Sequence, residues 1–141
     1  MWHMIWPILV VVGANTVYNI STKSMPTGVN SFAALAVSYA VGTLCSVIMF
    51  FVTSENKNLL LELSKTNWTS LALGMAIVAL EFGYIGIYRA GWKVSAASLV
   101  ANISLACILL VVGLWLYKET LSFRQILGMA VCIVGLILIA K

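Results

Sequence analysis

The sequence predicts an all-α integral membrane protein with five transmembrane helices. Of its 141 residues, 62% are hydrophobic and only 9% are charged, and the mean hydropathy is +1.07. A soluble domain of this length needs far more polar surface. The apolar residues also gather into five runs, each close to the roughly 20 residues with which a helix crosses a hydrocarbon core of about 30 Å. Such runs must be helical, because lipid offers no partners to backbone N–H and C=O groups.

The five predicted helices form a single transmembrane domain over residues 1–141. In chain order they cover residues 4–22, 31–52, 68–88, 94–117 and 123–140. Tryptophans are typical anchors in the membrane interface, and all five in this chain fall near the predicted helix ends. They are Trp2, Trp6, Trp68, Trp92 and Trp115.

The residues around the helix ends favour the same boundaries. Pro7 is expected in the first turn of the first helix, where a missing N–H is tolerated. Pro26 and Gly28 end that helix. The segment TSENKNLLLELSKTN, residues 53–67, is the only long polar connection, and its leucines indicate a short amphipathic turn on the membrane surface. The remaining connections, RAGWK and KETLS, are tight.

Several classes of protein are excluded by composition. The net charge is only +4 and the basic residues are scattered singly, so nucleic-acid binding has no support. The one histidine is His3 and aspartate is absent, so no Ser/His/Asp set, phosphate loop or metal cluster can be assembled. We therefore expect no enzyme activity and no metal or cofactor. Cys45, Cys107 and Cys132 lie in apolar runs and are expected to be packing residues.

The basic residues near the helix ends do not favour one orientation in the membrane. With five crossings, each side receives four of them. One side has Lys57, Lys65, Lys118 and Arg124, and the other has Lys23, Arg89, Lys93 and Lys141. Two interpretations remain open. The charge signal is weak in a small protein, or the chain inserts both ways and opposite copies pair as an antiparallel homodimer.

Glu81 is an acid inside the apolar run IVALEFGYIGIYRAGW. It lies about 15 Å into the third predicted helix, near the bilayer midplane. An acid there costs about 2.5–3.5 kcal/mol, so we expect it to face a partner helix or a wet cavity. Tyr84 and Tyr88 share its helix face. Because desolvation favours the neutral carboxyl, Glu81 could exchange a proton for a cationic substrate. The alternative is a packing salt bridge with Lys23 or Arg89.

Asparagines mark two other predicted helices. Asn15 and Asn19 lie on one face of the first helix, and Asn102 lies with Ser95 and Ser98 on one side of the fourth. Amides are costly to leave unpaired in an apolar environment. These three asparagines are therefore candidates for a substrate pathway, although hydrogen bonds between helices would also explain them.

The last predicted helix has no strongly polar group at depth. Gly128, Cys132 and Gly135 place small residues on one stripe, which lets helices approach closely. We interpret this helix as a packing or dimerisation element rather than a substrate wall.

The segment NISLACILLVVGLWLYKETLSFRQILGMAVCIVGLILIAK resembles the end of an EamA-like repeat of the drug/metabolite transporter superfamily. There an apolar helix ends in a Glu-containing turn and a Gln-x-x-Gly helix follows; here the positions are Glu119, Gln125, Gly128 and Gly135. The segment GANTVYNISTKSMP is similar to the first helix of that repeat. Small multidrug resistance proteins are related but carry their carboxylate in the first helix, where this chain has asparagines.

The resemblance implies a secondary-active transporter of small organic metabolites or cationic drugs, multi-pass in the inner cell membrane, in which one repeat pairs with an inverted copy. Larger relatives carry two such repeats in opposite orientation. On this basis we expect proton-coupled export by alternating access, with substrate held by Glu81, Tyr84, Tyr88 and the three asparagines. A non-transporting accessory or assembly subunit and a lipid-linked sugar carrier are the alternatives.

Overall fold

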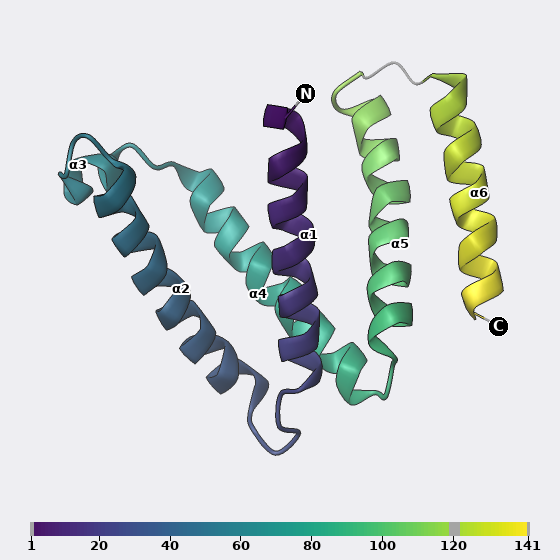
Figure 1. The fold of residues 1–141 in the computed structure, drawn as a ribbon, viewed down its shortest axis with the longest axis horizontal. Helices are drawn as coiled ribbons and strands as arrows, with labels where there is room; N and C mark the ends of the chain where they lie inside the picture. The colour runs from purple at the N-terminus through teal and green to yellow at the C-terminus, as the bar shows by residue number, and fades with distance from the viewer. Residues whose placement is uncertain (1, 119–121, 141) are drawn as a thin grey trace. The chain divides into compact units, whose positions relative to one another are not determined.

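The computed structural model describes residues 2–118 and 122–140, which contain six α-helices and no β-strand (Figure 1). The helices are α1 (Trp2–Lys23), α2 (Ser31–Thr53), α3 (Leu59–Ser64), α4 (Trp68–Arg89), α5 (Val94–Trp115) and α6 (Phe123–Ala140).

The predicted all-helical class is confirmed, and four helices are long and apolar enough to cross a membrane. These spans are Ile5–Lys23, Ser31–Thr53, Trp68–Arg89 and Val94–Trp115. The helix α6 has 18 residues, and its apolar stretch Phe123–Gly135 is shorter than the other four. The fifth crossing therefore stays a prediction.

Asparagine side chains fix the start of three helices. The Asn30 side chain accepts hydrogen bonds from the backbone N–H groups of Phe32 and Ala33 at the start of α2, at 2.9 and 3.3 Å. Asn58 caps α3 and Asn67 caps α4 in the same way. These contacts satisfy N–H groups that have no partner inside the helix. The segment expected to form an amphipathic turn is the helix α3.

The expected position of Pro7 was wrong. The helix α1 begins at Trp2, so Pro7 lies inside the helix rather than in its first turn. A proline there removes one backbone hydrogen bond donor. The apolar residues before Pro7 continue the helix in spite of this loss.

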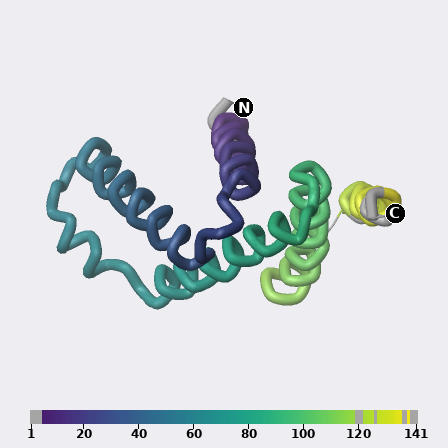
Figure 2. Tube along the Cα trace, turned by 90° about the horizontal axis from the view of Figure 1, so that it is seen from below, coloured from purple at the N-terminus to yellow at the C-terminus, as the bar shows by residue number. Residues whose placement is uncertain are grey.

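The described residues form two compact units. One contains residues 1–20 and 91–141, and within it α5 and α6 run antiparallel beside each other (Figures 1 and 2). The other contains residues 21–90, with α2 packed on α4. In this second unit the rings of Phe32 and Phe82 stack 4.9 Å apart, and Ile85 is only 2% exposed.

Most large apolar side chains on the long helices are exposed in the single chain. Val37 on α2 and Leu73 on α4 are 66% and 62% exposed. A soluble monomer rarely carries such continuous apolar surface. The surface suits contact with acyl chains or with other transmembrane helices.

Candidate functional site

Glu81 lies in the interior of α4, where it is half-buried. Its carboxylate is close enough to the Tyr39 hydroxyl of α2 to interact with it. That hydroxyl is buried and makes no hydrogen bond of standard geometry with the chain. The two groups are therefore neighbours across the contact between α2 and α4, with no hydrogen bond of standard geometry between them. An acid and a phenol from two packed helices are brought together within the span.

Tyr39 was missed by the sequence reasoning. It lies in the run LAVSYAVG and gives no periodic signal of its own. Its position offered a usable signal: it is the one tyrosine of α2, and a phenol in the middle of an apolar span needs a polar partner. Which helix would supply that partner depends on how α2 packs on α4, which spacing within α2 does not encode.

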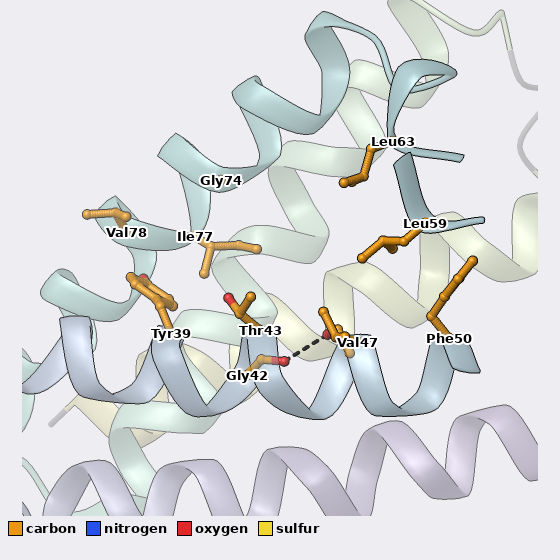
Figure 3. Close-up of a pocket in the computed structure, with 11 residues that line it drawn as sticks. Tyr39, Gly42, Thr43, Val47, Phe50, Leu59, Leu63, Gly74, Ile77 and Val78 are labelled. Carbon is orange, nitrogen blue, oxygen red and sulfur yellow. Dashed lines mark hydrogen bonds between the residues drawn. The ribbon is translucent and has the colours of Figure 1, made fainter. Parts of the chain in front are cut away.

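A cavity of about 680 Å³ lies beside this pair, between α2, α3 and α4 (Figure 3). Figure 3 shows Tyr39 and Thr43 pointing from α2 towards Ile77 of α4, while Leu59 and Leu63 reach in from α3 at the other end. The complete lining is Tyr39, Gly42, Thr43, Ser46, Val47, Phe50, Leu59, Leu63, Gly74, Ile77 and Val78.

The polar groups of this cavity are few. The Ser46 hydroxyl donates to the carbonyl oxygen of Gly42 at 2.8 Å, so that donor is used within α2. Tyr39 joins the cavity to the carboxylate of Glu81. The cavity is thus apolar for most of its length, with the carboxylate of Glu81 near the lining residue Tyr39. Such a lining suits an amphipathic or cationic ligand.

Tyr84 and Tyr88 do not line this cavity. Their ring centroids are 6.1 Å apart, and Tyr88 is only 5% exposed. The Lys23 Nζ atom lies 5.8 Å from the centre of the Tyr88 ring and 3.4 Å from the Tyr88 carbonyl oxygen. Tyr88 therefore packs near the lysine at the end of α1, and the Tyr84 ring lies beside Tyr88.

Arg89 binds the loop between α1 and α2. Its guanidinium donates to the Ser31 hydroxyl at 2.8 Å and to the carbonyl oxygens of Val29 and Pro26. Through these hydrogen bonds, the arginine at the end of α4 holds the loop in place. These hydrogen bonds replace the ion pair with Glu81 that was considered for Arg89 from the sequence.

The structure brings Asn15, Asn19 and Asn102 together in one groove between α1 and α5. The groove has a volume of about 470 Å³ and lies within the unit of residues 1–20 and 91–141. Asn19 is only 4% exposed. The complete lining is Val12, Asn15, Thr16, Asn19, Ile20, Val94, Ser95, Ser98, Leu99 and Asn102.

On α6, Gly128 and Cys132 are exposed and Gly135 is half-buried. A Cβ atom added at Gly128 or Gly135 would meet nothing within 4 Å, so the chain itself does not cover these positions. Glu119, singled out by the resemblance, lies outside the described residues. Within the described ranges, no three His, Cys, Asp or Glu side chains gather as metal ligands would.

A model of the EamA-like transporter family matches residues 1–141, which is the whole chain. No curated protein and no solved structure matches it. The family match and the four apolar helices together make this a multi-pass membrane protein of the transporter type. The resemblance seen in the sequence is thereby confirmed: the chain belongs to the EamA-like transporter family, within the drug/metabolite transporter superfamily.

Proposed function

We propose that this chain is a secondary-active transporter that moves small organic metabolites or cationic drugs and is coupled to protons through Glu81. One observation carries the proposal. A carboxylate inside a membrane-spanning helix lies near the Tyr39 hydroxyl, and Tyr39 lines a cavity of about 680 Å³. An ionisable group at this depth costs about 2.5–3.5 kcal/mol, and proton relays are a common reason to keep one.

In this mechanism Glu81 takes up a proton from one side of the membrane and releases it to the other. The neutral carboxyl needs no countercharge in an apolar surrounding, while the Tyr39 hydroxyl can turn to donate a hydrogen bond to the carboxylate once the proton has left. Both charge states of the acid then have a compensating interaction. A cationic substrate would bind when Glu81 is charged and leave when it is protonated.

The proposal includes an antiparallel homodimer. Inverted-repeat carriers hold substrate near the midplane and rock one repeat against the other. A single repeat can reach the same arrangement by pairing with an inverted copy. The equal division of eight basic residues between the two sides supports this, as do the uncovered small residues Gly128 and Cys132 on α6.

Uptake by proteoliposomes that contain only this chain tests the proposal against an accessory-subunit role. We expect uptake of a radiolabelled metabolite or quaternary amine from a screened panel, without any second protein. An accessory subunit would stay inactive until another gene product was added. Inactivity of the correctly folded chain alone, followed by activity on co-reconstitution, would reject the transporter assignment for the single chain.

A further inference from the structure

The groove between α1 and α5 contains no charged side chain among its lining residues. Its polar lining is made of three asparagines and three hydroxyl-bearing residues: Asn15, Asn19, Asn102, Thr16, Ser95 and Ser98. A charged ligand would lose its hydration here without meeting a countercharge, which is costly in an apolar surrounding. The groove therefore favours an uncharged ligand.

Several donors in this groove are used by their own helix. The Thr16 hydroxyl donates to the Val12 carbonyl oxygen at 2.8 Å. The Asn102 side-chain amide donates to the carbonyl and hydroxyl oxygens of Ser98, at 2.8 and 3.2 Å. These bonds turn the amide nitrogen of Asn102 towards its own helix and leave its carbonyl oxygen as an acceptor.

Other groups in the groove keep donors. The side-chain oxygen of Asn15 accepts from the Asn19 side-chain amide at 2.6 Å, which leaves the side-chain N–H groups of Asn15 for another partner. The Ser95 hydroxyl can donate or accept. The groove thus offers acceptors and donors side by side. A hydroxyl group matches such a lining, because it donates and accepts at the same atom.

The polar lining also has depth. Along α5 it runs from Val94 at the helix start to Asn102, about 12 Å by the helical rise. A polar groove of this length cannot face acyl chains without cost, so it needs water, a ligand or a protein surface to cover it. Its lining includes Val94 and Ser95 in the first turn of α5, which is near an end of the span, where water is available.

We propose that the α1–α5 groove binds an uncharged polyhydroxyl compound, or a polyhydroxyl head group, as the transported substrate. This inference rests on the proposed transport function and narrows its substrate class to uncharged metabolites. For such a substrate, Glu81 would couple transport to the proton without pairing with a cationic substrate. The inference assigns the two roles to different residues. Neutral amides and hydroxyls of the groove bind the substrate, while Glu81 takes up and releases the proton. A quaternary amine has no hydrogen-bond donors and would not use this groove.

Calorimetric titration of the purified full chain in lipid nanodiscs tests the inference. The probes are four uncharged polyols (myo-inositol, sorbitol, glucose and glycerol), the hexa-O-methyl ether of myo-inositol, and choline. We expect saturable binding of at least one polyol, and none of the ether or of choline at the same concentration. Binding of no polyol, or equal binding of the ether or choline, would overturn it.

Two groove variants and one matched control locate the site. Ser98→Ala should weaken polyol binding about 3- to 10-fold, the loss of one hydrogen bond, and Asn102→Leu should weaken it further. Ser104→Ala removes a hydroxyl from the same helix outside the groove lining and should leave binding unchanged. Equal effects of Ser98→Ala and Ser104→Ala would place any binding elsewhere.

The result is separable from the transport proposal, because binding does not require Glu81. Glu81→Gln should keep polyol affinity. If polyols bind but no proton-coupled uptake occurs, the groove assignment stands and the transport function fails. If another compound is transported and no polyol binds, transport stands and the groove assignment fails.

Discussion

At the scale of single residues, Glu81 and Tyr39 are the pair on which the account depends. The acid could be predicted from the sequence, because one carboxylate inside a long apolar run is costly and therefore informative. Its partner could not be predicted, because the contact joins α2 to α4. Tyr84 and Tyr88 share the helix face of Glu81, yet the Tyr88 ring packs near Lys23. The spacing of residues along a helix shows which side chains share a face, but it does not show which side chains of other helices that face contacts.

Removing the Tyr39 hydroxyl should slow transport. In Tyr39→Phe the charged state of Glu81 loses the hydroxyl that the mechanism turns towards it. A hydrogen bond to a charged group is worth about 1.5–3 kcal/mol, so initial uptake should fall about tenfold or more. Uptake rates in proteoliposomes measure this. Tyr117→Phe, which removes an exposed hydroxyl after the end of α5, is the control and should leave the rate unchanged.

Filling the cavity between α2 and α4 should also block transport. Gly74 lines the cavity, and a Cβ there meets nothing within 4 Å, so Gly74→Leu should fold and project into the empty space. We expect most uptake to be lost while helix content by circular dichroism is kept. Gly83→Leu, on the same helix but outside the cavity lining, should behave like the native chain. Normal uptake by Gly74→Leu would show that the cavity is not used.

At the scale of helices, the sequence is most informative about where each element begins and ends. The predicted boundaries lie within two residues of the observed ones, because the change from apolar to polar residues at the end of a span is a local feature. The misplaced Pro7 shows the limit, since α1 extends further towards the N-terminus than the apolar run indicated. The hydrogen bonds between Arg89 and the segment before and at the start of α2 could not be predicted from the sequence either, because they join positions nearly 60 residues apart.

Loss of the Asn30 cap should destabilise the start of α2. The Asn30 side chain satisfies two backbone N–H groups, so Asn30→Ala should lower the stability by about 0.5–2 kcal/mol. Asn30→Asp keeps an acceptor oxygen and should be close to the native chain. Thermal unfolding in detergent, followed by circular dichroism, measures both. Equal stability of Asn30→Ala and the native chain would mean that the cap contributes nothing.

Arg89 should stabilise the same region from the other side. Arg89→Ala removes hydrogen bonds to Ser31, Val29 and Pro26 and should cost about 1–3 kcal/mol. Arg89→Lys keeps the positive charge but loses the planar guanidinium with its several N–H donors. Its stability should therefore lie between those of Arg89→Ala and the native chain. A lysine variant as stable as the native chain would indicate that charge alone is needed.

At the scale of the whole molecule, the class and the family could be predicted from composition and from the closing motif, because both are properties of the entire chain. The candidate sites were predicted only in part. Asn15, Asn19 and Asn102 meet in one groove, as residues repeated along two helix faces can. The cavity beside Glu81 is lined in part by α3, whose position at the cavity has no sequence signature.

The antiparallel homodimer predicts dual topology. Reporter fusions at Lys141, one active only in the cytoplasm and one only outside it, should both give signal, because the five predicted crossings would give each side of the membrane the same number of basic residues. Adding two lysines to the segment 53–67 should shift the chain to one orientation. Signal from a single side of the membrane for the native sequence would remove the inverted pair.

Accumulation driven by a pH gradient tests the coupling role of Glu81 most directly. Proteoliposomes with the native chain should concentrate the substrate against its gradient when a pH difference is imposed, and should lose this ability when a protonophore is added. Glu81→Gln, with native helix content, should show no gradient-driven accumulation. Accumulation by Glu81→Gln equal to that of the native chain would contradict the account.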